Sequence, residues 1–374
     1  MKFTIAKPEL LRGLTRIQTI VEKRNTMPIL ANVLLEAKSA RDGGHLELAA
    51  TDLEVGIRGS HSCEVAKAGG ITVSAKKLFE IVRELPEEAV HIEVSENAYL
   101  TLRCARAAFT LAGTTAEEYP TLPSIAPERT VTVQAAVLGD MIERTMYAAS
   151  SDETRYNLNG VYFERLADSG KLRMVATDGH RLACVDRALG SDIEGLERGV
   201  IIPRKGLSEL KRLVDEEDAD EVELGFEGNS GLARRGGVTL VMRLIEGEFP
   251  NYRQVIPTDP QHRLSLPAEP LLHALRRVAL LSAERSRAIR LELADGRLGL
   301  SSNNPDLGEA REELDVDYAG EALAIAFNAR YLMDAVGACG GKEVRIAFRD
   351  PLSPALLTPT DDDDSLAVVM PMRL

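Results

Sequence analysis

The chain has 374 residues, a hydrophobic content of 44% and a formal net charge of −13 at pH 7. Its length allows two or three domains of ordinary size, and no apolar run approaches the roughly 18 residues that a membrane-spanning helix needs. The acidic balance, taken alone, argues against a nucleic-acid-binding protein.

The first predicted element is the stretch Phe3–Leu14, which has the pattern of a short strand, a proline and an amphipathic helix. The same pattern returns at Val131–Ile142 and at Leu264–Leu275. In each copy two strand residues flank a Thr or Ser, and a leucine opens the helix seven positions after the first residue. A pattern that recurs at a nearly constant separation is the mark of internal repeats.

A hairpin pattern follows in each copy at the same place. Its second strand opens with Leu46, Leu172 or Leu298, and a glycine stands two residues before each of these leucines. Glycine supplies the positive φ that a tight hairpin needs. The three strands end on equivalent polar pairs, which are Thr51-Asp52, Thr177-Asp178 and Asn303-Asn304. A second strand-to-helix passage and a closing strand follow, so we interpret the chain as three copies of one unit.

Two proline-bearing segments, residues 120–127 and 250–260, read as linkers between the copies. We therefore predict domains at residues 1–124, 125–257 and 258–374. Sequential strands joined by short glycine turns are antiparallel, so each domain is expected to be α+β, with antiparallel sheets and two helices on one face. The helices are predicted at residues 7–24, 76–88, 134–155, 204–217, 267–287 and 329–342.

The charge is unevenly distributed over these predicted elements. The six helices together carry a slight surplus of Lys and Arg, whereas the acidic surplus lies in the strands and loops. One interpretation is that the helices face an anionic partner. The alternative is that helices simply favour Lys and Arg.

The sequence contains few motifs that are typical of enzymes or of cofactor-binding proteins. It has no nucleotide-binding glycine motif, no His-Glu-x-x-His motif and no nucleophile elbow. The six histidines show no metal-ligand spacing, and the run Asp361–Asp364 lacks the spaced ligands of a calcium loop. We expect that run to be a solvated hairpin tip, and we predict no metal and no cofactor. The four cysteines are widely spaced, which favours reduced thiols in a cytoplasmic protein; they are Cys63, Cys104, Cys184 and Cys339.

One polar cluster, Thr177–Leu182, could serve an enzyme, because Asp178, His180 and Arg181 offer a carboxylate, an imidazole and a guanidinium. However, Thr51-Asp52 occupies the equivalent place in the first repeat without the histidine and arginine. A position shared between repeats favours a structural strand end or an edge that binds a partner.

The whole chain resembles the bacterial replicative sliding clamps, the β subunits of DNA polymerase III. The stretch Thr177–Ala183 (TDGHRLA) and the end Val368–Leu374 (VVMPMRL) are specific to that family. Supporting matches are Met1–Thr4, Thr51–Glu54, Arg155-Tyr156, Leu158–Gly160, Pro203–Gly206, Phe249-Pro250, Tyr252-Arg253 and Asn303–Pro305.

The resemblance implies three tandem DNA-clamp domains, each with antiparallel sheets outside and two helices inside. Two chains would close head to tail as a homodimeric ring of six domains around double-stranded DNA. Such a clamp is not an enzyme; it tethers the replicative DNA polymerase as a processivity factor. A clamp loader and other proteins with a clamp-binding motif are the further partners implied, and no membrane is involved.

The family's DNA-contacting positions fall on five residues of this chain. Lys76 keeps a positive charge where the family carries arginine, whereas Asp152 and Asn157 are neither basic nor aromatic. The five implied DNA-binding residues are Arg24, Lys76, Asp152, Tyr156 and Asn157.

The resemblance also implies a pocket for partner peptides. Leu, Val, Pro and Met would supply an apolar floor, and methionine adapts to varied ligands. Two or three buried anchors, less ordering costs, correspond to affinities on the order of micromolar. Gln254 stands where the family often has arginine. The implied pocket residues are Leu158, Thr177, Gly179, His180, Arg181, Leu182, Pro250, Arg253, Val255, Asn328, Tyr331, Leu352, Val368, Val369, Met370, Pro371, Met372, Arg373 and Leu374.

Two alternatives to a clamp stay open from the sequence. One is an enzyme that uses Asp178, His180 and Arg181, which turnover assays would detect. The other is a repeat protein that scaffolds other proteins without DNA. Retention on circular compared with linear DNA would distinguish that scaffold from a clamp.

Overall fold

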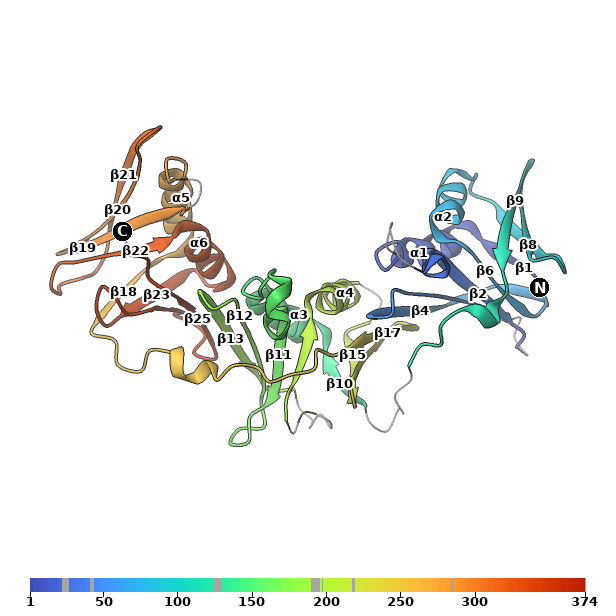
Figure 1. The fold of residues 1–374 in the computed structure, drawn as a ribbon, viewed down its shortest axis with the longest axis horizontal. Helices are drawn as coiled ribbons and strands as arrows, with labels where there is room; N and C mark the ends of the chain where they lie inside the picture. The colour runs from blue at the N-terminus through green and yellow to red at the C-terminus, as the bar shows by residue number, and fades with distance from the viewer. Residues whose placement is uncertain are drawn as a thin grey trace. The chain divides into compact units, whose positions relative to one another are not determined.

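The computed structural model describes residues 1–21, 27–40, 44–123, 130–189, 196, 198–216, 219–283 and 286–373. Within them the chain forms two compact units (Figure 1). Unit 1 holds Met1–Ala135 and Ser208–Leu244, and unit 2 holds Ala136–Asp192, Leu196–Leu207 and Ile245–Leu374. None of the helices in the described ranges is long and apolar enough to cross a membrane.

Unit 1 is built on one sheet with the strand order β10-β15-β16-β17-β4-β3-β2-β6-β9-β8-β7-β1-β5. Helices α1 (Lys7–Ile17) and α2 (Ala75–Glu84) lie side by side against it (Figure 1). The strands are β1 Lys2–Ala6, β2 Asn32–Lys38, β3 His45–Thr51, β4 Val55–Ser62, β5 Glu64–Lys67, β6 Gly69–Ser74, β7 Ala89–Val94, β8 Tyr99–Cys104, β9 Ala107–Thr114, β10 Thr130–Gln134, β15 Glu221–Glu227, β16 Ser230–Arg235 and β17 Val238–Arg243.

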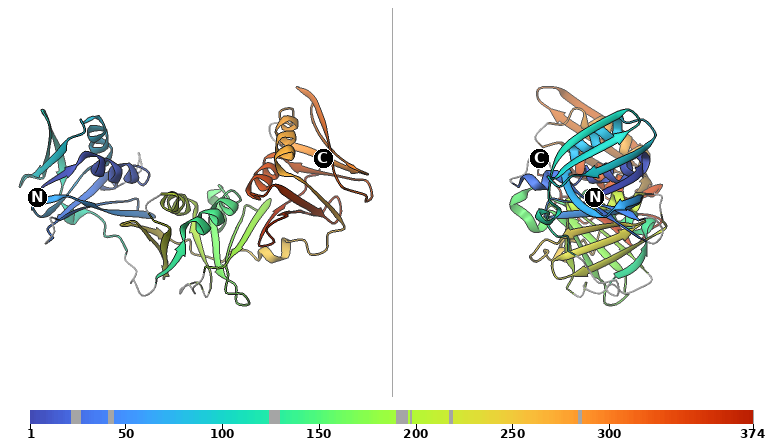
Figure 2. Two further views of the ribbon diagram at one scale, coloured as in Figure 1. Left: turned by 180° about the vertical axis from the view of Figure 1, so that it is seen from behind. Right: turned by 90° about the vertical axis from the view of Figure 1, so that its right-hand side faces the viewer.

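Unit 2 has a sheet with the order β14-β11-β12-β13-β25-β24-β23-β18 and a second with the order β21-β20-β19-β22. Helices α5 (Ala268–Ala279) and α6 (Ala329–Ala338) pack together (Figure 2). The strands are β11 Gly160–Arg165, β12 Leu172–Thr177, β13 Arg181–Arg187, β14 Val200–Pro203, β18 His262–Pro267, β19 Ala288–Ala294, β20 Arg297–Asn304, β21 Gly308–Asp315, β22 Leu323–Asn328, β23 Glu343–Phe348, β24 Ala355–Pro359 and β25 Ser365–Val369.

The middle repeat contributes two more helices, α3 (Ala135–Met146) and α4 (Arg204–Asp215). All strand pairs of the described residues in these sheets are antiparallel, for example β12 with β13 and β15 with β16. The predicted α+β layering, with antiparallel sheets and two helices per repeat, is therefore confirmed.

The predicted helix starts are correct to within one residue, but the predicted ends lie too far along the chain. The helix expected at 134–155 ends at Met146, and the one expected at 267–287 ends at Ala279. Beyond Met146 the amides of Ala148 and Ala149 bond three residues back, which tightens the last turn. The apolar pattern continues past each true end, so hydrophobicity alone extends the predicted helix.

The glycines expected to permit the three hairpins have the predicted geometry. Gly44, Gly170 and Gly296 have φ of 122°, 66° and 70°, a region that residues with a Cβ rarely adopt. They connect β2 to β3, β11 to β12 and β19 to β20.

Neighbouring repeats are joined by strand pairing. In unit 1, β4 of the first repeat pairs with β17 of the second, with Val55 opposite Met242 and Gly59 opposite Val238. In unit 2, β13 of the second repeat pairs with β25 of the third, with Arg181 opposite Val369. The strand after the polar pair is thus the joining edge in both repeats.

Candidate functional site

The Thr177–Arg181 turn is built by its own side chains. The Thr177 hydroxyl donates to the Arg181 carbonyl at 2.7 Å and accepts from the Gly179 amide at 3.1 Å. The Asp178 carboxylate accepts from the amides of His180 and Arg181 at 2.9 and 3.0 Å. Gly179 has φ of 87°. Short polar side chains that bond to backbone groups two or three residues on are typical of turns.

The charged groups of this turn are bound to one another. The Arg181 guanidinium donates to Asp178 at 3.1 Å and to Asp334 of α6 at 2.6 Å, and its side chain is 10% exposed. The guanidinium also lies 4.5 Å from the centre of the Tyr331 ring. Asp178 and Arg181 therefore hold the turn and attach it to α6, which gives no support to the alternative of a catalytic triad.

A cavity of about 140 Å³ opens beside the turn. It lies between the end of β12, the start of β13, β25 and the segment that follows Pro250. Nine of the residues predicted from the family resemblance line it; they are Leu158, Thr177, Gly179, Arg181, Leu182, Pro250, Val255, Val368 and Met370.

Two further residues, Asn251 and Tyr252, line the cavity and were missing from the predicted set. Tyr252 is 3% exposed, and its hydroxyl accepts from Arg173 at 3.2 Å and donates to Glu164. Burial raises the pKa of the Tyr252 phenol, so the group stays neutral. The sequence signal was present, because Tyr252 belongs to a motif that carried the resemblance.

The floor of the cavity is apolar. Val175, Leu182, Cys184, Tyr252 and Val368 form one buried cluster. The partly buried rings and aliphatic side chains packed against this cluster are Tyr162, Phe249, Val255, Ile256, Leu356 and Leu366. Burial also raises the pKa of the Cys184 thiol to about 12, so it is a packing group here and not a nucleophile. Such a site can take up apolar side chains of a ligand.

Some predicted pocket residues stand at the edge of the cavity. The His180 ring stacks on Tyr331 with the ring centres 6.2 Å apart. The Asn328 side chain caps α6 by accepting from the amides of Arg330 and Tyr331. These three residues, with Arg181, form a polar wall next to the turn.

The remaining predicted pocket residues do not line the cavity. Arg253 pairs with Glu164 at 2.7 Å, and Leu352 is 72% exposed in a separate turn. Val369 is fully buried in the core cluster of the third repeat. Met372 bonds through its amide to the Ala326 carbonyl. Pro371 and Arg373 lie on either side of Met372, and Leu374 falls outside the described residues.

The implied DNA-binding residues are placed as follows. Arg24 falls outside the described residues. Lys76, near the start of α2, is 65% exposed and lies 3.7 Å from Glu80. Tyr156 is 60% exposed, and the Asn157 side chain donates to the Glu248 carbonyl.

Asp152 has a structural task of its own. It precedes the short helix Glu153–Leu158, and its carboxylate accepts from the hydroxyl and the amide of Thr154. These hydrogen bonds lower the pKa of Asp152, so the group is ionised at neutral pH.

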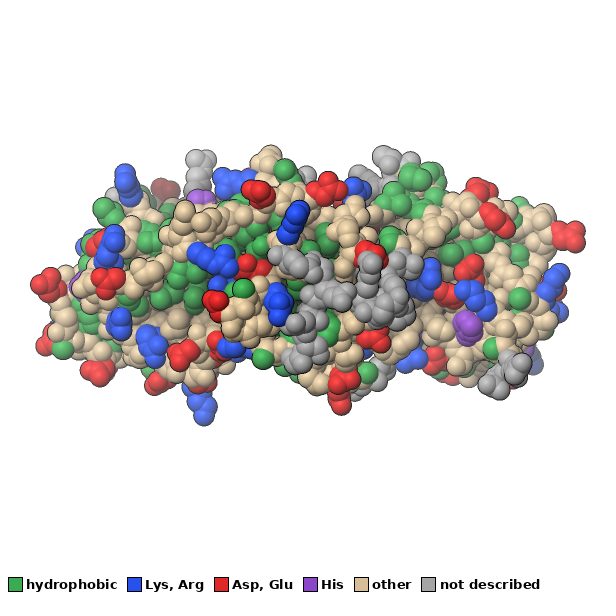
Figure 3. Space-filling model, turned by 90° about the horizontal axis from the view of Figure 1, so that it is seen from below, with side chains coloured by type: hydrophobic (Ala, Val, Ile, Leu, Met, Phe, Trp, Pro, Cys, Tyr) green, Lys and Arg blue, Asp and Glu red, His purple; other side chains and the backbone are tan. Residues whose placement is uncertain are grey.

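Acidic and basic side chains are interspersed over the coloured part of the face in Figure 3.

Comparison with known proteins gives one family along the whole chain. Residues 1–123, 132–251 and 253–373 match the N-terminal, central and C-terminal domains of the DNA polymerase III beta subunit. The chain is 40% identical over 377 residues to the beta sliding clamp of Pseudomonas aeruginosa and 38% identical over 378 residues to that of Caulobacter vibrioides. Both alignments cover all of each chain.

Solved structures give the same result. A sliding clamp from Pseudomonas aeruginosa bound to griselimycin superimposes with a TM-score of 0.93 at 38% identity, again over the full length of both chains. These alignments include the residues of the three repeats, of the Thr177–Arg181 turn and of the cavity. The chain belongs to the family of DNA polymerase III beta subunits, the bacterial sliding clamps.

Proposed function

We propose that this protein is a DNA sliding clamp that encircles duplex DNA and tethers the replicative polymerase to it. The observation that carries the proposal is the match of three successive clamp domains over the full chain. The protein acts as a processivity factor and not as an enzyme. A closed ring is held by topology, so its contacts with phosphates can stay weak and blind to sequence, as sliding requires.

The repeats support a specific way of closing the ring. In the first two repeats, the strand that follows the polar pair is hydrogen-bonded to the last strand of the next repeat. These pairs are β4 with β17 and β13 with β25. In the third repeat the equivalent strand is β21, which pairs only with β20 among the described residues. The strand equivalent to β17 and β25 is β9 of the first repeat. We assign β21 of one copy to β9 of a second copy, which closes two chains head to tail.

Exposed apolar residues support this pairing. Phe109 on β9 is 37% exposed, and Leu280, just past the end of α5, is 76% exposed. Among the described residues β9 pairs with β6 only through Gly113 and Thr114, so Phe109 lies on a part of β9 whose edge is open. Large apolar side chains at such an edge favour burial against a partner. Sedimentation at micromolar concentration should therefore give twice the 40.7 kDa chain mass.

The domain boundaries are proposed at 1–124, 125–257 and 258–374, supported by the residue ranges that match the three domains of the family.

Five residues are proposed to contact DNA, namely Arg24, Lys76, Asp152, Tyr156 and Asn157. The exposure of Lys76 and Tyr156 supports this role, whereas the hydrogen bonds of Asp152 favour a capping role for that residue. The protein is assigned to the cytoplasm, where DNA is replicated in bacteria.

The cavity beside the Thr177–Arg181 turn is proposed to receive the apolar anchors of partner peptides. Partners of this kind are the replicative polymerase subunit, the clamp loader and other proteins with a clamp-binding motif. The apolar floor supports the site, and the clamp of a relative has been solved with griselimycin bound to it. The full proposed set is the pocket list given for the sequence, extended by Asn251 and Tyr252.

The decisive experiment is topological retention. Clamps loaded on a nicked circle should survive high salt and should leave once the circle is cut. Equal rates of loss from circular and linear DNA would contradict encirclement.

Removal of Met370–Leu374 should abolish binding of a labelled polymerase-tail peptide while the protein stays a folded dimer. Unchanged peptide affinity in that dimer would mean that the groove lies elsewhere.

A further inference from the structure

The four-aspartate turn Asp361–Asp364 connects β24 to β25 in the third repeat. From the sequence it was expected to be a solvated hairpin tip. It is a hairpin tip, and three of its four residues are exposed, but the Asp362 side chain is only 20% exposed. Two of the four carboxylates are bound by residues of the second repeat.

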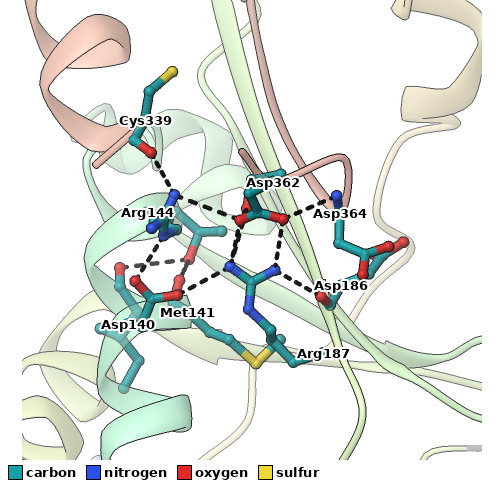
Figure 4. A network of polar contacts seen from close by, with 11 residues as sticks. Asp140, Met141, Arg144, Asp186, Arg187, Cys339, Asp362 and Asp364 are labelled. Atoms are coloured by element: carbon teal, nitrogen blue, oxygen red, sulfur yellow. Dashed lines mark hydrogen bonds and ion pairs between the residues drawn. The ribbon is translucent and has the colours of Figure 1, made fainter. Parts of the chain in front are cut away.

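Asp362 is the centre of these contacts (Figure 4). Its carboxylate accepts from Arg187 at 2.6 Å and from Ser365 at 2.6 Å, and it also caps the Asp364 amide at 3.0 Å. The same Arg187 donates to Asp140 of α3 at 3.1 Å. Arg187 therefore connects a helix and a strand of the second repeat to one turn of the third.

Asp364 adds two more contacts to the same repeat. Its carboxylate accepts from Lys171 at 2.6 Å, and its carbonyl accepts from the Asp186 amide at 2.8 Å. Arg144 of α3 lies 3.7 Å from Asp362 and donates to the Cys339 carbonyl at 2.5 Å. The turn is thus bound from α3, from the start of β12 and from the end of β13.

The turn precedes the strand that forms one wall of the cavity. β25 runs along β13 from Ser365, opposite Val185, to Val369, opposite Arg181, and Met370 then bonds to His180. The span is about 13 Å. A slip of one residue would turn Val368 away from the cavity, because side chains alternate between the faces of a strand.

Among the described residues, the equivalent turn of unit 1 makes no carboxylate contact with the strand that it faces. The residue at the place of Arg187 is His61, which faces Glu9 of its own repeat at 3.3 Å. The turn before β17 contains Gly236 and Gly237. Within the described ranges its one hydrogen bond to the first repeat is from the Ser60 amide to the Gly237 carbonyl.

The unit 1 junction does have carboxylate contacts between repeats, from Arg16 to Glu216 and from Thr19 to Glu209. These contacts join the end of α1 to α4, whereas at the junction that carries the cavity the carboxylates belong to the turn before β25.

We propose that the Asp361–Asp364 turn is a latch in which Asp362, held by Arg187, fixes the register of β25 on β13 and thereby positions Val368 and Met370 for the ligand. Asp362 is a positioning residue, since it does not touch the cavity. This inference rests on the peptide site proposed above, and it assigns a specific task to a segment that the family resemblance left without one.

The test compares Asp362→Asn with Asp363→Asn in the full-length protein. Both variants remove one charge from the same turn, but Asp363 is exposed, and among the described residues its side chain takes part in no hydrogen bond or ion pair. Asp362→Asn should weaken griselimycin binding roughly fivefold, as for loss of a partly exposed ion pair. Hydrogen exchange at Leu366–Met370 should accelerate by a similar factor. Asp363→Asn should leave both within about twofold.

Arg187→Gln supplies a second arm. If Arg187 and Asp362 act as one latch, the double variant with Asp362→Asn should bind griselimycin no more weakly than either single variant. Equal effects of the two Asn variants, additive effects in the double variant, or faster exchange with unchanged affinity would overturn the latch. If the unaltered protein binds neither griselimycin nor a polymerase-tail peptide, the peptide site is wrong, whereas the exchange rates still test the register of β25.

Discussion

The turns Thr51–Val55 and Thr177–Arg181 have the same hydrogen bonds and different surroundings. In the first, the Thr51 hydroxyl donates to the Val55 carbonyl, and Asp52 accepts from the amides of Glu54 and Val55. The second repeats these bonds with Thr177 and Asp178. The turn is therefore a structural unit of the repeat, and it does not by itself make a binding site.

The surroundings of the two turns differ in the linker residue that covers the strand after each turn. Gly56 follows the first turn, and Leu122 of the linker packs so closely on it that an added methyl group would collide with the leucine. Leu182 stands at the equivalent place of the second turn, and there the linker supplies Tyr252 and leaves a cavity. One linker fills its own groove and the other leaves a groove for a ligand.

The largest expected effect comes from emptying the filled groove. Leu122 is 8% exposed, so Leu122→Ala should lower the free energy of unfolding of unit 1 by about 3 kcal/mol. Urea denaturation measures the change. Leu307→Ala, at an exposed turn leucine, should cost less than about 0.5 kcal/mol. An equally small effect of Leu122→Ala would mean that the linker does not stabilise this groove.

A somewhat smaller effect is expected from the open groove. Leu182→Ala removes an apolar wall of the cavity, so binding of a polymerase-tail peptide at the proposed site should weaken by about 2 kcal/mol, or roughly thirtyfold. Calorimetric titration gives the affinity, and the melting temperature reports whether the fold is kept. Leu307→Ala again serves as the control. Unchanged affinity in a folded Leu182→Ala protein would contradict the location of the site.

The two turns also differ at the residue with positive φ, which is Leu53 with φ of 77° in the first and Gly179 with φ of 87° in the second. Gly179→Ala should destabilise unit 2 by about 1 kcal/mol, because an L-residue pays a steric cost in this region. Leu53→Gly should be neutral or stabilising by up to about 1 kcal/mol. Chemical denaturation should therefore give a lower free energy of unfolding for Gly179→Ala and an unchanged or higher one for Leu53→Gly. Equal losses would show that the backbone is not the cause.

The smallest effect concerns pH and two residues near the ends of the joining strands, His61 of β4 and Arg187 of β13. Burial lowers the pKa of His61, which is 1% exposed, from its ordinary value of 6.5. The unfolded chain then binds the proton more readily, so unit 1 should lose stability as pH falls below 6.5. Arg187, at the equivalent place, stays charged throughout. Urea midpoints at several pH values should show a shallower acid slope for His61→Gln; an unaltered slope would assign the acid sensitivity to other groups.

Local chemistry in the sequence predicted much of this molecule. The hairpin glycines, the helix starts and the repeated Thr-Asp turn depend on residues close together in the chain. Family motifs then placed nine residues around the cavity. Helix ends were predicted too late, since apolar residues continue past the last helical hydrogen bond.

Long-range pairing was the part that local chemistry could not supply. Asp362 meets Arg187 across 175 positions of the chain, and nothing around either residue indicates the other. The same holds for β4 with β17, because an edge strand exposes the same backbone groups to any partner. Tyr252 was overlooked although it stands in a motif that carried the resemblance; what the sequence could not show is that its hydroxyl is buried between Arg173 and Glu164.

The strand pairing between repeats has a consequence for synthesis. β4 is complete once Ser62 has been made, yet its partner β17 begins at Val238. A growing chain therefore carries an unpaired strand edge until most of the second repeat has emerged from the ribosome. Open edges of this kind recruit strands from other chains. Newly made molecules would thus need protection by a chaperone during that interval, and a chain that stops after the first linker should aggregate.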